Sequence, residues 1–161
     1  MRPMNLARSG YTLIELLVVL GVLALLASMA MPLAEVTMQR ERERELKRAL
    51  WEIRDAIDAY HRAREAGAFA GAPEGPGYPA DLLALTQPMV DARPERRGEV
   101  LRLLRRVPRD PFADPSLAPE RSWGLRSYQS EADQPQAGSD VYDVYSRSEA
   151  TGLNGVPLKQ W

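Results

Sequence analysis

The feature that most restricts this chain is an apolar run near its N-terminus: residues 16–34 are 19 consecutive positions without a charged side chain. Only Gly21, Ser28 and Pro32 within the run are not hydrophobic. As an α-helix with a rise of about 1.5 Å per residue, the run would extend roughly 28 Å, close to the ~30 Å thickness of a bilayer core. The run therefore predicts a membrane-spanning helix. A buried core helix is the alternative, disfavoured because no later segment of similar hydrophobicity could cover it.

Basic residues precede the apolar run, since residues 1–10 include Arg2 and Arg8. A secretory signal peptide has an apolar region of about 7–15 residues before a small-residue cleavage site, and this run is too long for that. A signal anchor fits better, and the positive flank places the N-terminus in the cytoplasm. Residues 39–48 carry charges of both signs, so counting alone leaves the orientation open.

Glu15 stands at the entrance of the apolar run, in the string GYTLIELL of residues 10–17. A carboxylate that enters hydrocarbon unpaired costs a few kcal/mol, so Glu15 would require a cationic partner there. The alternative is that Glu15 caps the first turn of a helix, where the macrodipole favours an anion.

This string resembles the class III signal of type IV pilins and type II secretion pseudopilins. The resemblance implies that a prepilin peptidase cuts between Gly10 and Tyr11, removes residues 1–10 as a leader peptide and methylates the new N-terminal amine of Tyr11. It also makes Glu15 the glutamate at the fifth mature position of that family. The family usually has Phe where this chain has Tyr11, a conservative difference that leaves the processing prediction unchanged.

Glu15 and Pro32 are the residues to which the resemblance gives a role in assembly. The carboxylate of Glu15 can pair with the new α-amino group of a neighbouring subunit, because either charge alone would be penalised in a low-dielectric helix bundle. Pro32 lacks a backbone N–H and clashes with the preceding turn, so we expect it to kink or locally melt the helix. Residues 11–36 are thus predicted to be a transmembrane helix that forms the filament core after assembly.

Residues 37–66 predict an amphipathic continuation of the helix, with few helix breakers before Gly67. Its apolar residues recur at helical spacing and must pack on another element. They are Met38, Leu46, Leu50, Ile53, Ile57 and Tyr60, with Ala49 and Ala56 beside them. On the polar side, Glu43 and Lys47 have the i,i+4 spacing of a favourable ion pair.

The remaining residues, 67–161, contain 11 of the 13 prolines and predict loops and short strands in a periplasmic globular domain. Helical candidates are residues 79–85 and 93–106, and strand candidates are residues 124–129 and 141–146. The expected fold is α+β: a long N-terminal helix, transmembrane in its first half, packed on a small antiparallel β-sheet in the lollipop shape of pilins.

Four later segments strengthen the resemblance and direct it toward major pseudopilins of the type II secretion system. They resemble, in order, the tyrosine-proline segment, the Pro-x-Asp-Pro turn, the following strand and the final strand of those proteins: residues 77–82 (GYPADL), 107–112 (VPRDPF), 123–128 (WGLRSY) and 141–146 (VYDVYS). Type IV pilins proper often close a C-terminal loop with a disulfide, and this chain has no cysteine. A type IV pilin or a minor pseudopilin is the alternative within the family.

Major pseudopilins commonly bind calcium in a loop after the final strand. Calcium takes six to eight oxygen ligands, so carboxylates must be concentrated there. In this chain residues 147–155 contain no aspartate, and Glu149 and Asn154 are the best ligand candidates. Asp140 and Asp143 are nearby, but an acid at a strand end is more often a solvated or capping group. We expect that the protein requires no cofactor. The resemblance leaves open whether it binds calcium.

Composition and motifs argue against several other classes of protein. The net charge is −1, from 21 Lys and Arg against 22 Asp and Glu, which gives no basis for nucleic-acid binding. Without cysteine the chain cannot form a Cys-ligated zinc site or a thiol nucleophile. His61 is the only histidine, and we expect it to be an exposed bystander. We therefore predict that the chain is not an enzyme. A membrane-anchored periplasmic enzyme or binding protein, with paired carboxylates, stays as the alternative of another class.

The resemblance as a whole implies a structural protein of the general secretion pathway. Its precursor would be a single-pass protein of the bacterial inner membrane with its C-terminal domain in the periplasm. After processing it would polymerise through its N-terminal helices into a periplasmic pseudopilus that drives protein export across the outer membrane. The implied partners are further copies of itself, the prepilin peptidase, minor pseudopilins, an inner-membrane assembly platform and its cytoplasmic ATPase.

Overall fold

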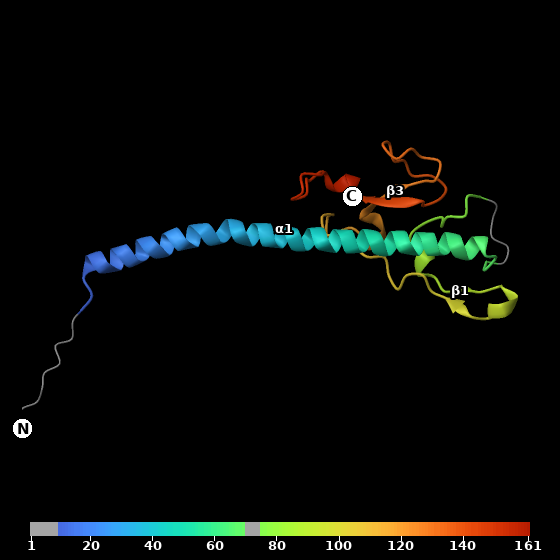
Figure 1. Cartoon of the computed structure of the whole chain (residues 1–161), viewed down its shortest axis with the longest axis horizontal. Helices are drawn as coiled ribbons and strands as arrows, with labels where there is room; N and C mark the ends of the chain where they lie inside the picture. The colour runs from blue at the N-terminus through green and yellow to red at the C-terminus, as the bar shows by residue number, and fades with distance from the viewer. Residues whose placement is uncertain (1–9, 70–74) are drawn as a thin grey trace, which may run out of the picture. The chain divides into compact units, whose positions relative to one another are not determined.

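One long helix, α1 (Leu13–Glu65), dominates the structure, and the other elements are short strands and 3₁₀ turns (Figure 1). The computed structural model describes residues 10–69 and 75–161, except for the side chains of residues 29–33. The chain divides into two compact units, Met1–Gln39 and Arg40–Trp161, and α1 contributes to both. The fold is α+β with a long N-terminal helix, as predicted, and the described residues form two small antiparallel sheets where one was expected.

α1 is assigned as continuous helix from its first residue to its last, and Pro32 is helical within it. The expected local melting of the helix at Pro32 is therefore absent from the described backbone. A proline removes one hydrogen bond, and the flanking residues are mostly Leu, Ala and Met, which favour helix and can sustain it. The side chain of Pro32 lies outside the described side chains, and its role in assembly stays a prediction.

The C-terminal end of α1 is closed by a glycine. Gly67 has a φ of 75°, a left-handed conformation that favours glycine. Its N–H donates to the carbonyl of Arg64 at 2.9 Å, and the N–H of Ala68 donates to the carbonyl of Ala63 at 2.9 Å. This pair of bonds is a Schellman motif, which satisfies carbonyls at the end of the helix and stops it.

The hydrophobic core lies entirely within the second unit. On α1, Leu46, Ile53 and Ile57 are each 0% exposed and Leu50 is 2% exposed. Burying each such side chain stabilises the fold by roughly 1.5–3 kcal/mol. The later segments contribute the other buried members of the core: Leu82, Leu85, Leu104, Val107, Trp123, Val141, Val144 and Leu158. The predicted stripe on the helix is thus confirmed from Leu46 onward, and Tyr60 packs against the core at its edge.

Met38 does not belong to this stripe, in contrast to the prediction. Its side chain is 61% exposed, because the buried hydrophobic residues of α1 begin at Leu46, two turns later. The helical spacing of apolar residues identified the correct face but could not show where along the helix the packed partner begins.

The larger of the two sheets is a pair of antiparallel strands, β3 (Trp123–Arg126) and β4 (Asp143–Ser146). β4 falls inside the predicted candidate 141–146, whereas β3 begins one residue before the candidate 124–129 and ends three residues before its end. Gly124 lies opposite Tyr145, and a Cβ at Gly124 would come within 2.3 Å of the Tyr145 ring. The ring occupies the space of the missing side chain, so this position requires glycine.

The predicted helix over residues 93–106 is wrong. The structure has a 3₁₀ turn, η2 (Pro94–Arg96), followed by β2 (Val100–Leu101), which pairs antiparallel with β1 (Met89–Val90). Gly98 between them has a φ of 91°, which a helix cannot accommodate. The apolar residues that suggested a helix form the short strand instead.

The predicted helix over residues 79–85 is reduced to one 3₁₀ turn, η1 (Ala84–Thr86). Two further 3₁₀ turns, η3 (Pro119–Arg121) and η4 (Leu158–Gln160), complete the described elements. Asp81 accepts a hydrogen bond from the N–H of Ala84 at 2.8 Å, which satisfies a donor at the start of η1.

Candidate functional site

The predicted processing site lies directly in front of α1. Gly10 and Tyr11 are exposed and precede the helix, and Tyr11 is 78% exposed. Proteolysis favours exposed backbone that secondary structure does not protect, so the bond between Gly10 and Tyr11 is accessible. Residues 1–9, which form the rest of the predicted leader, lie outside the described residues.

Thr12 caps the N-terminus of α1. Its hydroxyl oxygen accepts a hydrogen bond from the N–H of Glu15 at 3.3 Å, and its carbonyl accepts one from the N–H of Leu16 at 3.2 Å. Thr12 and Glu15 have the T-x-x-E spacing of a capping box, a sequence signal that predicts a helix start at this position. The cap sets the first turn of the helix directly after the predicted cleavage site.

Glu15 lies in the first turn of α1, at the helix end where the macrodipole favours a carboxylate. Its residue is exposed. Among the residues that the structure describes, its carboxylate has no hydrogen bond or ion pair. This position fits the alternative interpretation, in which the macrodipole favours the Glu15 anion in the first turn. The assembly role of its carboxylate stays a prediction.

The apolar part of α1 is exposed on every face. The large hydrophobic side chains from Leu13 to Leu26 range from 49% exposed at Val19 to 77% at Leu13. Five consecutive residues, 16–20, are all in this set, and at about 100° per residue they cover the whole circumference. A helix that is hydrophobic all round is normally buried in a membrane or in a larger assembly.

The one hydroxyl in this part of α1 is satisfied within the helix. The Oγ of Ser28 donates to the carbonyl of Leu25 at 2.7 Å. Such back-bonding lets a serine reside in a low-dielectric environment without an unsatisfied polar group.

No helix built from the described residues is long and apolar enough to qualify as a membrane span. The predicted transmembrane segment, residues 11–36, includes residues 29–33, whose side chains lie outside the description.

The loop after β4, residues 147–155, is the one in which calcium ligands were sought. Glu149 is exposed. The Oδ1 of Asn154 accepts a hydrogen bond from the N–H of Val156 at 3.1 Å, so it is used to close the loop. Within the described part of the chain, no group of three or more His, Asp or Glu residues is placed to hold a metal ion.

Asp140 and Asp143 accept hydrogen bonds from residues outside the loop. Asp140 is 6% exposed and accepts hydrogen bonds from the Oγ of Ser127 at 3.0 Å and the N–H of Tyr128 at 2.8 Å. Asp143 accepts one from the Nε of Arg54 at 2.8 Å. The carboxylates of Asp140 and Asp143 are therefore engaged by donors that lie outside the loop.

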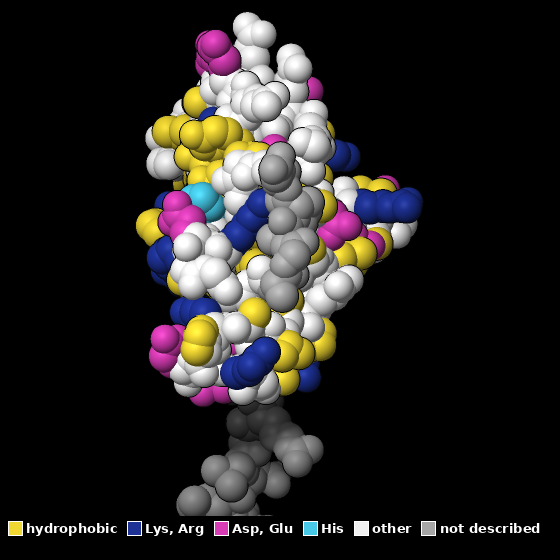
Figure 2. Space-filling view, turned by 90° about the vertical axis from the view of Figure 1, so that its right-hand side faces the viewer, with side chains coloured by type: hydrophobic (Ala, Val, Ile, Leu, Met, Phe, Trp, Pro, Cys, Tyr) yellow, Lys and Arg dark blue, Asp and Glu magenta, His cyan; other side chains and the backbone are white. Residues whose placement is uncertain are grey.

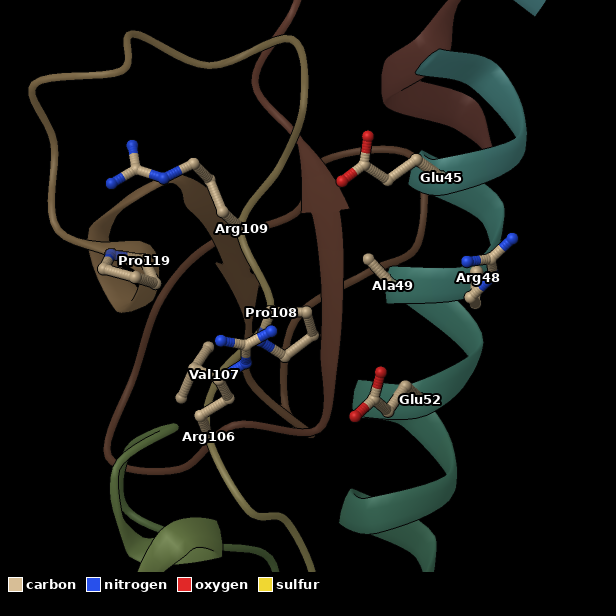
Figure 3. A pocket seen from close by; sticks show the side chains of 9 residues that line it. All are labelled: Glu45, Arg48, Ala49, Glu52, Arg106, Val107, Pro108, Arg109 and Pro119. Atoms are coloured by element: carbon tan, nitrogen blue, oxygen red, sulfur yellow. The ribbon is translucent and has the colours of Figure 1, made fainter. Parts of the chain in front are cut away.

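A cleft of about 450 Å³ lies between α1 and the segment before η3 (Figure 3). Its lining residues are Glu45, Arg48, Ala49, Glu52, Arg106, Val107, Pro108, Arg109 and Pro119. In Figure 3 the carboxylates of Glu45 and Glu52 extend from the helix toward this segment. The lining contains two carboxylates, those of Glu45 and Glu52, and no serine, threonine or histidine.

His61 is partly buried, in contrast to the prediction that it is exposed. Its ring stacks on Tyr78 at a centroid distance of 4.4 Å, and its side chain is 27% exposed. Gly77 has a φ of 91°, and a Cβ there would lie 2.7 Å from Nδ1 of His61. The backbone of Gly77 thus approaches the helix closely and covers the histidine, a tertiary contact that helical periodicity cannot show.

Charges of both signs are interspersed over the face of the molecule in Figure 2, among hydrophobic side chains. On this face the Lys and Arg side chains are separated by other side chains and do not form one continuous positive patch.

Residues 5–31 match the family described as the prokaryotic N-terminal methylation motif. No curated protein and no solved structure gives a significant match to the chain. The matched segment contains Gly10, Tyr11, the Thr12 cap and Glu15, together with most of the apolar run. The chain therefore carries the class III signal of type IV pilin-like proteins, which supports its assignment to the pilins and pseudopilins.

Proposed function

We propose that this protein is a structural pseudopilin, a subunit that polymerises into the periplasmic filament of a type II secretion system. The observation that carries the proposal is the apolar part of α1, exposed on every face directly after a methylation motif. Exposing such a surface to water is unfavourable, so we expect lipid to cover it before assembly and neighbouring helices to cover it afterwards. The work of this protein is then assembly rather than catalysis.

The absence of cysteine supports the choice of a pseudopilin over a disulfide-closed type IV pilin. The C-terminal segment is instead tied down by side chains of α1, for example by Arg54, whose Nη2 donates to the backbone oxygen of Trp161 at 2.9 Å. In this proposal the precursor is anchored in the inner membrane, and the Arg40–Trp161 unit lies in the periplasm.

Processing is tested by the intact mass and N-terminal sequence of the full chain, extracted from membranes of cells with and without a prepilin peptidase. We expect a chain that begins at N-methylated Tyr11 when the peptidase is present and an uncleaved precursor when it is absent. An intact N-terminus in both strains, or a cut after Ala30, would overturn the proposal.

Glu15→Ala tests the assembly role of the exposed carboxylate. We expect the variant to be processed and retained in the membrane but to form at least about tenfold less filament, because an α-amino group loses its charge-assisted partner. The matched control is Glu35→Ala, which removes an exposed carboxylate from the same helix beyond the apolar run. Filament yield is measured by shearing and immunoblotting. Normal filaments from Glu15→Ala would contradict the pairing role.

A further inference from the structure

Three polar side chains on one stripe of α1 contact the C-terminal segment of the chain. They are Glu43, Lys47 and Arg54, spaced by four and seven residues, which places them on the same face of a helix. Glu43 contacts Leu153, Lys47 contacts the ring of Trp161, and Arg54 contacts β4 and the backbone of Trp161. These three side chains therefore form a polar stripe on α1, beside the apolar stripe that packs in the core.

Glu43 is the first of these contacts. Among the described residues it is the only charged residue of α1 that is buried, with an exposed fraction of 9%. Its Oε1 accepts a hydrogen bond from the backbone N–H of Leu153 at 2.8 Å, across 110 positions of sequence. A buried carboxylate is strongly penalised unless donors satisfy it, so this bond fixes the tip of the loop to the helix.

Lys47 and Trp161 form the second contact. The Nζ of Lys47 lies 4.4 Å from the centroid of the Trp161 ring, a cation–π geometry. The same ring covers Gly152, where a Cβ would come within 2.4 Å of it. The indole thus contacts both a side chain of the helix and the backbone of the loop, and only glycine fits at position 152.

Arg54 forms the third contact and joins three parts of the chain. Its Nε donates to Asp143 at 2.8 Å, and its Nη2 donates to the backbone oxygens of Val144 at 3.0 Å and Trp161 at 2.9 Å. The planar guanidinium has donors in a fixed fork, so it holds β4 and the last residue in one arrangement.

Two oxygen atoms of residues 147–155, the carbonyl oxygen of Gly152 and Oδ1 of Asn154, are engaged in closing the loop. The carbonyl of Val156 accepts from the N–H of Gly152 at 2.9 Å, the carbonyl of Gly152 accepts from the N–H of Gly155 at 2.9 Å, and Asn154 is used as described above. In the described structure, the one buried polar side-chain atom without a partner is Nε1 of Trp161. That atom is an N–H donor, which cannot ligate a cation.

We propose that the carboxylate of Glu43 holds the loop of residues 147–155 in the place where related proteins would use calcium, so that the fold of this protein is independent of calcium. A helix carboxylate that accepts a backbone N–H replaces a cation that would gather backbone carbonyls. The loop therefore contributes a hydrogen-bond donor, the Leu153 N–H, to its contact with the helix, whereas a calcium ion would require acceptors from the loop.

The full chain in a mild detergent tests the calcium part of this proposal. We expect the melting temperature of wild type to be the same in EDTA and in ~1 mM CaCl₂, a concentration that occupies sites of extracellular affinity. A rise of several degrees with calcium, or heat of binding in a calorimetric titration, would overturn it, since a ligand that binds only the folded state must stabilise it.

Hydrogen exchange of the Leu153 amide tests the clamp itself. We expect Glu43→Leu to exchange this amide at least about tenfold faster, the equivalent of losing one hydrogen bond to a charged group. Glu43→Gln keeps an acceptor of the same shape and should retain part of the protection. Glu52→Leu is the matched control, because it removes an exposed carboxylate from the same helix away from the loop.

Unchanged exchange at Leu153 in Glu43→Leu would overturn the clamp, as would faster exchange in Glu52→Leu of the same size. Processing between Gly10 and Tyr11 is not expected to change in any of these variants. Failure of the clamp is therefore distinguishable from failure of the proposed function.

Discussion

Buried aspartates organise the loops of the globular unit. Asp110 is 1% exposed, and its Oδ1 accepts a hydrogen bond from the N–H of Phe112 at 2.8 Å while its Oδ2 accepts one from Ser146 at 2.6 Å. The first bond is an Asx turn, and the second joins this turn to β4. A single carboxylate thus sets both a local turn and a long-range contact.

Asp110→Ala should lower the free energy of unfolding by about 2–4 kcal/mol, because the Ser146 hydroxyl and the Phe112 N–H lose their acceptor in the core. Urea denaturation followed by tryptophan fluorescence measures the change. Asp114→Ala is the control, since Asp114 makes the same kind of turn with the N–H of Ser116 but is exposed. Equal decreases in the free energy of unfolding in the two variants would show that the burial of Asp110 and its bond to Ser146 do not add to stability.

The ion pair between Asp91 and Arg93 makes the stability of the folded state depend on pH, in a direction that the pKa shift determines. The hydrogen bonds from the Arg93 side chain lower the pKa of Asp91 from 3.8 to about 2. A depressed carboxyl pKa stabilises the folded state fully above the unfolded value of 3.8, and this stabilisation is lost as the pH falls through about 2. We expect Asp91→Asn to melt at a lower temperature than wild type at pH 6 and the difference to vanish near pH 2. A difference that persists at the lowest pH would contradict this cause.

At the scale of elements, the two parts of α1 differ in what their apolar residues contact. Ile53 is 0% exposed in the core, whereas Leu20 is 61% exposed. Ile53→Ala should therefore destabilise the globular unit by about 2–5 kcal/mol. Leu20→Ala should leave its thermal denaturation unchanged and reduce filament yield instead. A Leu20→Ala variant that lowers the melting temperature as much as Ile53→Ala would contradict this division.

Short strands and turns were predicted less well than the helix, for reasons visible in particular residues. The 19-residue apolar run and the Leu46–Ile57 stripe have a strong period, so sequence alone identified α1. Residues 93–106 combine leucines with arginines, and only the φ of 91° at Gly98 and the pairing with β1 show that they form a strand. Local pattern cannot decide between helix and strand when the partner is distant in sequence.

At the scale of the whole molecule, every buried hydrophobic residue of the core belongs to the Arg40–Trp161 unit. We expect residues 40–161 alone to fold cooperatively and to remain monomeric, because they keep the core and lack the exposed apolar helix surface. Thermal denaturation by circular dichroism and gel filtration test this. A fragment that is unfolded, or that assembles like the full chain, would contradict the division.

The sequence by itself determined the processing motif, the apolar run that follows it and the face of α1 that is buried, because each is written in contiguous or periodic residues. Only the tertiary structure decided that Gly77 covers His61 and that Glu43 accepts the Leu153 N–H. The physical reason is that spacing along the chain records local geometry. A hydrogen bond across 110 positions depends on how the folded chain returns to the helix.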